Sequence, residues 1–331
     1  MAYIDIKHDN TSELYKNTLS MYELFCTEIF PSEVEVLDGF QNLIYLLYKA
    51  HGQEPPVIHT YTINPIDLST SSDKDIILGF SGGLDSAYNA LYLYDIGYNV
   101  TLMHIKNLNK SYPKEDEFAC RFAENHNFNY VEMDAKHYAK EFFIDNPLKN
   151  QLILSVMIDY GIAHGINVYS LGADTCTPIS QSTIGMTITD SIEVNEFFWE
   201  GVKRYIPYAT LRFIPNDIKK YDRLKYILSN HPSALNDIYS CITPHRFNNS
   251  LHKHNEEKYG IHLLDGRCGS CFKCCMEGIL LSELGYYDKD SEFIKHCWDI
   301  LANSKNSHRK DLFNKKIPLA ERYKNILNYG S

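Results

Sequence analysis

The sequence predicts an α/β protein built on a doubly wound parallel sheet, with further segments before and after the sheet. Two observations lead to this fold class. Short apolar runs alternate with helical patterns between residues 75 and 235, and the first apolar run ends in a glycine-rich turn. Such alternation is typical of parallel sheets with right-handed crossovers. Ligands of these sheets bind beyond the carboxyl ends of the strands, so the loops that follow the strands are the first candidates for a site.

The individual elements follow from the spacing of apolar residues. Helical spacing between Leu14 and Phe25, and again between Phe40 and Leu47, predicts a mostly helical extension over residues 1–74. The last segment, residues 236–331, contains a cysteine cluster and is predicted to be helical. In the central segment, residues 75–235, we expect strands over Ile76–Phe80, Val100–Ile105, Tyr130–Met133, Val168–Leu171 and Thr210–Ile214, and helices over Ala87–Tyr94, Glu115–His126, Leu148–Ala163 and Val194–Tyr205.

Composition narrows the class of protein. The chain has 331 residues and a formal net charge of −10, with 44% hydrophobic and 22% charged residues, which are the proportions of a globular protein. No apolar run approaches the roughly 18 residues of a membrane span. The opening MAYIDIKHDN lacks the basic and then apolar stretch of a secretory signal. We therefore expect a soluble cytoplasmic protein. The net negative charge argues against a nucleic-acid partner. The sequence does not decide whether the protein forms a homodimer.

The turn after the first predicted strand reads Ser-Gly-Gly-Leu-Asp-Ser over residues 81–86. Glycines permit positive φ and a close approach of the backbone to an anion, and the N–H groups at a helix start point at that anion. Ser81 and Ser86 add hydroxyl donors, and Asp85 offers a carboxylate to Mg²⁺. The turn matches neither the Walker loop nor the dinucleotide fingerprint. It predicts a phosphate-binding loop, the alternative being a tight turn with a capping serine.

Four of the nine cysteines form a metal-binding pattern: Cys241, and then Cys268, Cys271 and Cys274, with two residues between each of the last three and the next. Thiolates at this spacing converge from a tight loop, and four of them complete a tetrahedral Zn²⁺ site of structural type. The alternatives are buried reduced thiols, a redox pair and an iron–sulfur cluster. A histidine could also replace one cysteine, and Cys275 is left over. The histidines in question are His245, His252, His254 and His262.

Together the two motifs resemble a known family. SGGLDS is similar to the SGGxDS signature of the PP-loop ATP pyrophosphatases, and Ser240-Cys241 followed by Cys268-x-x-Cys271-x-x-Cys274 resembles the zinc pattern of their 7-cyano-7-deazaguanine synthase (QueC) branch. The resemblance covers residues 75–289 and implies an adenine nucleotide alpha hydrolase-like fold. It implies an ATP-dependent C–N ligase that adenylates 7-carboxy-7-deazaguanine, releases pyrophosphate and uses ammonia to form an amide and then a nitrile. ATP, Mg²⁺ and Zn²⁺ would be the cofactors.

The resemblance also implies roles for particular residues. Ser81, Asp85, Ser86 and Lys220 would act in catalysis, with Lys220 steadying the phosphates. The deazapurine substrate would meet Asp174, Asp190 and Glu196, and the metal would be bound by the four cysteines. The nucleotide would lie against the following residues: Phe80, Ser81, Gly82, Gly83, Leu84, Asp85, Ser86, Met103, His104, Gly172 and Ala173.

The chain departs from the family in two loops and in its added segments. Lys106–Lys114 and the long, polar Asp174–Asp190 replace compact family loops, and residues 1–74 and 290–331 are additional. In these additions the chain resembles QueC-like proteins of bacterial antiphage systems, in which the activated deazapurine can be joined to a protein amine. The nucleophile is therefore either ammonia or a protein acceptor. Two further hypotheses are a tRNA-modifying PP-loop enzyme, which the acidic charge disfavours, and a non-catalytic ATP-binding adaptor.

Overall fold

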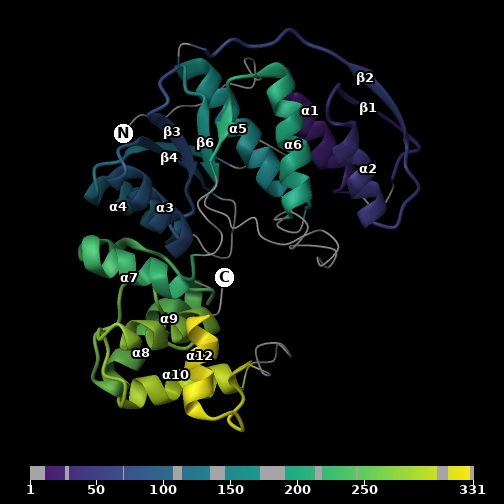
Figure 1. Ribbon diagram of the computed structural model, residues 1–331. Coiled ribbons are helices and arrows are strands. Elements are labelled where there is room, and N and C mark those ends of the chain that lie inside the picture. Colours follow the sequence, from purple (N-terminus) through teal and green to yellow (C-terminus); the bar gives the residue numbers. More distant parts are fainter. Residues whose placement is uncertain are drawn as a thin grey trace. The chain divides into compact units, whose positions relative to one another are not determined.

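The computed structural model describes residues 12–26, 30–69, 71–106, 114–134, 146–171, 191–212, 218–243, 245–303 and 312–328 (Figure 1). The chain divides into two compact units. The first unit contains Met1–Phe80, Leu93–Leu108 and Phe128–Asn216, and the second contains Ser81–Tyr92, Asn109–Asn127 and Asp217–Ser331. The sheet belongs to the first unit, whereas the glycine-rich turn and the cysteine cluster belong to the second.

A five-stranded parallel sheet forms the centre of the first unit, which confirms the predicted α/β class. Its strand order is β5-β4-β3-β6-β7, and every neighbouring pair is parallel. The chain order reverses at β3, which pairs with β4 on one side and β6 on the other, and such a switch point is where ligands of these sheets bind. The strands are β3 Asp75–Gly79, β4 Asn99–Lys106, β5 Asn129–Asp134, β6 Val168–Leu171 and β7 Thr210–Leu211.

Helices α5, Lys149–His164, and α6, Ile192–Tyr205, share a buried core with the sheet. Helix α5 packs against β3 and β6 and ends at Gly165, whose φ of 67° is the left-handed conformation that glycine favours at a helix end. Helix α6 begins at Ser191, which accepts a hydrogen bond from the Val194 N–H. These helices cover apolar sheet residues, and the buried core of the unit runs through both of them.

The N-terminal extension combines helices with strands, and the strands are a feature that helical spacing did not predict. Helices α1, Glu13–Leu24, and α2, Gln41–Ala50, confirm the two predicted helices, while β1, Glu33–Leu37, pairs in parallel with β2, Val57–Tyr61. The sequence of β1, EVEVL, alternates polar and apolar residues, the period of a half-buried strand. Because α1 packs against α5 and α2 against α6, the extension shares the core of the first unit.

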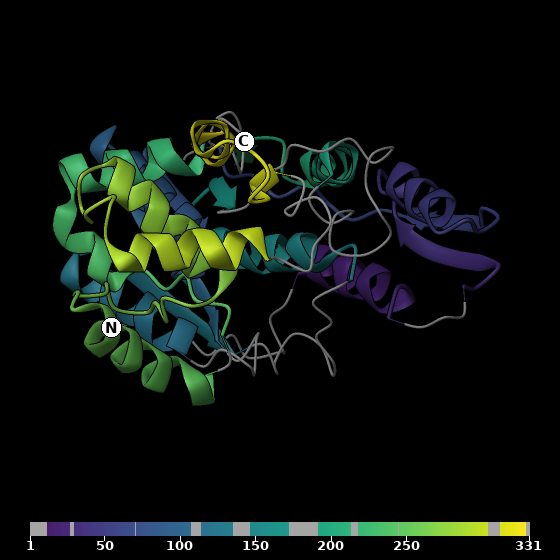
Figure 2. The same ribbon diagram turned by 90° about the horizontal axis from the view of Figure 1, so that it is seen from below.

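The elements that the structure describes in the second unit are helices. Its green to yellow helices lie together in both ribbon views (Figures 1 and 2). Among the residues that the structure describes, no helix combines the length and the apolar character needed to cross a bilayer. The elements are the first part of α3 Leu84–Asp95, then α4 Lys114–Asn125, α7 Lys220–Asn230, the 3-10 helix η4 Pro232–Asp237, α8 His245–Tyr259, α9 Phe272–Glu283, α10 Glu292–Ala302 and α12 Leu319–Leu327.

Candidate phosphate loop and four-cysteine site

The glycine-rich turn is held in shape by its own two serines. The Ser81 hydroxyl lies 3.1 Å from the Ser86 hydroxyl and accepts a 3.3 Å hydrogen bond from the Gly83 N–H. The Ser86 hydroxyl accepts from the Ser81 N–H at 3.3 Å and donates to the Gly83 carbonyl at 3.1 Å. Gly82 has a φ of 73°, so a side chain there would strain the turn. Ser86 is buried and Ser81 is exposed, so Ser81 is the hydroxyl available to a ligand.

Two cations on helix α7 contact the carboxylate of Asp85. The Lys220 ammonium lies 3.1 Å from Asp85 Oδ2, and the Arg223 guanidinium donates to Oδ1 at 2.5 Å. Residues three apart share a helix face, which brings both cations to one carboxylate. Burial raises the pKa of Asp85, but the charges of Lys220 and Arg223 outweigh it and hold this pKa below its usual range. The predicted residue Lys220 therefore does lie beside the loop.

Arg223 is a residue of this site that sequence reasoning missed. Its side chain is 2% exposed, and its guanidinium lies 5.9 Å from the centroid of the Tyr88 ring. The Tyr88 ring in turn packs edge-on against Tyr226 of α7, with centroids 5.2 Å apart. This aromatic contact fixes α7 against α3, and thereby fixes both cations relative to Asp85. The sequence feature that could have identified Arg223 is its position, three residues after Lys220 and so on the same face of a helix.

The four predicted cysteines converge on one point. Their sulfur atoms all lie within 4.8 Å of one another, with 3.9 Å between Cys241 and Cys271 and 4.0 Å between Cys268 and Cys274. In a tetrahedral zinc site with Zn–S bonds of about 2.3 Å, the sulfurs are about 3.8 Å apart. The arrangement therefore fits a tetrahedral metal ion bound by four thiolates.

Backbone amides support the ionised form of these thiols. N–H groups of Thr243, Cys271 and Cys274 donate to cysteine sulfurs at 3.3–3.5 Å, and the Cys271 sulfur is also the N-cap of α9. Hydrogen bonds from the neighbouring thiols lower the pKa of Cys241, whereas burial and its neighbours raise the pKa of Cys274. A bound cation would favour ionisation of all four thiols, so the donor set fits Zn²⁺.

Among the described residues, the group that could hold a metal ion consists of the four cysteines and includes no histidine. The His252 ring donates from Nδ1 to the Arg267 carbonyl at 2.7 Å, and His262 pairs with Glu256 at the surface. Cys275 is buried and donates to the Gly269 carbonyl at 3.6 Å, so the expectation that it stands outside the ligand set agrees with its contacts. The side chain of His245 lies outside the described part of the chain.

The other predicted site residues are divided between described and undescribed segments. In the first unit, the Phe80 N–H donates to the Met103 carbonyl, and His104 Nδ1 donates to the Phe80 carbonyl, both at 2.8 Å. These bonds tie the residue after β3 to β4. Glu196 is exposed on α6. Gly172, Ala173, Asp174 and Asp190 lie outside the described residues, as does the interior of the loop between Lys106 and Lys114.

The fold and the two sites define the class: an α/β protein with a parallel sheet, a glycine-rich turn at a helix start, and a four-cysteine group that can hold a metal ion. Within this class, 67 residues, 20% of the chain, are 39% identical to the 7-cyano-7-deazaguanine synthase of Sulfolobus acidocaldarius. The match spans 14% of the length of that relative. No family model matches the chain.

Proposed function

We propose that this chain is an ATP-dependent enzyme of the QueC kind. It adenylates the carboxylate of 7-carboxy-7-deazaguanine, or a close analogue, and releases pyrophosphate. The observation that carries the proposal is the SGGLDS turn with Lys220 on its Asp85, in the same unit as the four-cysteine group. The partial identity with the synthase of Sulfolobus acidocaldarius supports the same family.

In this proposal the loop binds the two phosphates that leave. A carboxylate oxygen of the substrate forms a bond to the α-phosphorus of ATP, and the bond from that phosphorus to the bridging oxygen breaks, so pyrophosphate departs with the electron pair. The exposed Ser81 hydroxyl and the start of α3 bind its oxygens. The Lys220 ammonium stabilises the negative charge that develops on the leaving group. Mg²⁺ on the phosphates would add further charge neutralisation, with Asp85 as its candidate ligand.

The adenylate then makes the carboxyl carbon electrophilic. The lone pair of ammonia attacks that carbon and AMP leaves, which gives the amide, and a second adenylation allows dehydration to the nitrile. The four cysteines take no part in these steps, because a metal with four thiolate ligands has no open position for water or substrate. Their proposed role is structural.

A protein amine is the second candidate nucleophile. It is favoured by the long polar segment Asp174–Asp190 and by the added residues 1–74 and 290–331. Attack by a lysine or N-terminal amine on the same adenylate would release AMP and leave an amide on the polypeptide. The chain would then work with a protein acceptor, as in the antiphage conjugation chemistry that it resembles.

One experiment distinguishes these reactions. The protein is incubated with MgATP, 7-carboxy-7-deazaguanine and ammonium. The masses of the small molecules and of the polypeptides are then measured by mass spectrometry. AMP, pyrophosphate and a free amide or nitrile are expected for the synthase, and a mass increase on a polypeptide indicates conjugation. ADP in place of AMP contradicts the proposal. ATP binding without turnover supports a non-catalytic adaptor, and turnover only with added tRNA supports a tRNA-modifying enzyme.

A further inference from the structure

A short segment of the second unit connects the phosphate loop to the four-cysteine site. This linking segment is Leu235–Cys241. The Tyr239 N–H donates to the Gly82 carbonyl at 2.8 Å, and two residues later Cys241 supplies a sulfur to the cysteine group. A Cβ added to Gly82 would lie 3.2 Å from the Ala119 backbone nitrogen, so α4 closes another side of the loop. A shift of the Tyr239 backbone would therefore displace Gly82 or break the hydrogen bond between the two residues.

The side chain of Tyr239 packs into the same buried cluster as the cysteines. Tyr239 and Phe118 are each 3% exposed, with ring centroids 5.4 Å apart, and they share one apolar cluster with Cys241 and Cys268. Gly266 lies in the segment before α9, residues 266–271, which we call the cysteine loop. Its φ is 71°, and a Cβ there would lie 2.9 Å from the Phe118 ring. The two rings thus fill the space between α4 and the cysteine loop, with no room for an independent movement of either.

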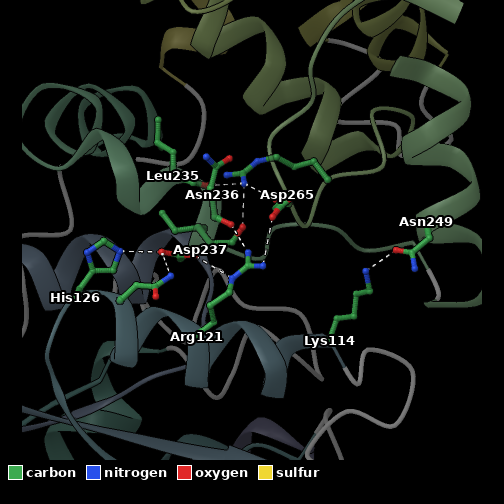
Figure 3. A network of polar contacts seen from close by, with 11 residues as sticks. Lys114, Arg121, His126, Leu235, Asn236, Asp237, Asn249 and Asp265 are labelled. Atoms are coloured by element: carbon green, nitrogen blue, oxygen red, sulfur yellow. Dashed lines mark hydrogen bonds and ion pairs between the residues drawn. The ribbon is translucent and has the colours of Figure 1, made fainter. Parts of the chain in front are cut away.

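Charged side chains, half-buried on one side and buried on the other, fix the linking segment from both sides (Figure 3). From α4, Arg121 donates to the Asn236 carbonyl and forms a 3.0 Å ion pair with Asp237. From the cysteine loop, Arg267 donates to the Leu235 and Ile238 carbonyls at 3.0 and 2.9 Å. Arg267 is itself 3% exposed, and it pairs with Glu277 of α9 at 3.1 Å. A segment held in this way moves as one piece, because each displacement would break several buried polar contacts.

We propose that the four-cysteine site is a positioning device for the phosphate loop, which acts through Tyr239 of the linking segment. Metal occupancy fixes Cys241, Cys241 fixes the backbone of Tyr239, and that backbone holds Gly82 in the conformation that receives phosphate. By thermodynamic reciprocity, a nucleotide bound at the loop must tighten the metal by the same factor, expected to be roughly tenfold. The nucleotide part rests on the proposed function, whereas the effect of metal on loop order does not.

The first test alters the connection and leaves the metal ligands intact. Tyr239→Ala, in the full chain loaded with zinc, removes the ring contact with Phe118 and keeps the backbone. Tyr239→Phe is the matched control, because the Tyr239 hydroxyl is buried without a hydrogen-bond partner among the described residues. Tyr239→Ala should keep about one zinc per chain yet bind MgATP roughly tenfold more weakly than the control. Equal MgATP affinity in the two variants would overturn the proposal.

The second test uses the wild-type chain, and so does not depend on how a variant folds. Amide hydrogen exchange is measured with zinc bound and after removal by a chelator. Zinc removal should speed exchange in the peptide over Ser81–Ser86 more than in a peptide from α10, which lies in the same second unit and serves as the reference. Saturating MgATP should slow zinc transfer to the chelator. Unchanged exchange over Ser81–Ser86, or acceleration no greater than that of α10, would contradict the proposal. A chain without pyrophosphate release but with the expected exchange would refute the proposed enzyme alone.

Discussion

Arg223 and Lys220 contact the same Asp85 carboxylate from very different environments. The Arg223 side chain is 2% exposed, whereas that of Lys220 is 21% exposed and that of Asp85 is 32% exposed. Arg223 is fixed by burial, and its charge acts with that of Lys220 to keep the pKa of Asp85 low. Lys220 reaches solvent and can turn toward a bound phosphate at little cost, since partly exposed ion pairs contribute about 1 kcal/mol or less. Arg223 therefore orders the site, and under the proposed function Lys220 is the cation that acts on the substrate.

Lys220→Met should reduce pyrophosphate release by roughly a hundredfold or more, because it removes the cation that stabilises the leaving charge. The free energy of unfolding should change by less than about 1 kcal/mol, since the ion pair is partly exposed. Initial rates and denaturant unfolding check the two parts. Lys219→Met is the matched control: that ammonium bonds Asn328 at the surface, and its loss should leave the rate near the wild-type value. An equal loss of rate in both variants would contradict the role of Lys220.

Asp85→Asn should cost stability as well as activity. The substitution keeps the shape of the side chain and removes the charge that faces the buried Arg223 guanidinium. We expect a loss of about 2 kcal/mol in the free energy of unfolding, less than for a fully buried pair because Asp85 is partly exposed. Chemical denaturation measures it. The double variant Asp85→Asn with Arg223→Met should recover part of that stability without recovering activity; a double variant less stable than either single variant would contradict the pairing.

The parts of the fold that sequence predicted are those with a local signal. The apolar run Val168–Leu171 forms β6 with the same bounds, and the cysteines separated by two intervening residues converge as their spacing predicts. The EVEVL alternation of β1 was equally readable, but the helical spacing on both sides of it masked a segment of only five residues.

Ion pairs between residues far apart in the chain could not be predicted from the sequence. Arg223 lies 138 positions from Asp85, and no periodicity connects the two. The same holds for Arg121 and Asp237, which meet only because α4 and η4 pack together. Such pairs depend on tertiary packing, and packing is what a single sequence specifies least directly.

Purified protein should carry about one zinc ion, and Cys271→Ser should lose it together with much of the stability of the second unit, because binding energy of a structural zinc is folding energy. Elemental analysis and thermal unfolding measure both effects. Cys275→Ala is the control, since its sulfur bonds a carbonyl outside the ligand group and zinc should be retained. Iron with absorption in the visible range would instead indicate a cluster, and a metal-free chain with wild-type stability in Cys271→Ser would refute the site.

The contact between Asp159 and Ser12 predicts a pH dependence of stability in the first unit. Burial raises the pKa of Asp159 to about 6, although hydrogen bonds from Ser12 and the charge of Lys16 oppose the shift. A carboxyl group whose pKa is higher in the folded state stabilises the fold when protonated, below its unfolded pKa of about 3.9. That contribution is lost as the pH rises through about 6, and it amounts to about 3 kcal/mol at most.

Asp159→Asn should therefore flatten the pH dependence, because the amide does not titrate while its oxygen still accepts from Ser12, the N-cap of α1. Unfolding in urea is followed at pH 5 and pH 7 by the fluorescence of Trp199 on α6. Both proteins carry Trp298→Phe, so that this signal comes from the first unit alone. The wild type should lose more stability than the variant between the two pH values. Equal losses would show that Asp159 has an ordinary pKa, and that the Ser12 contact does not bury its charge.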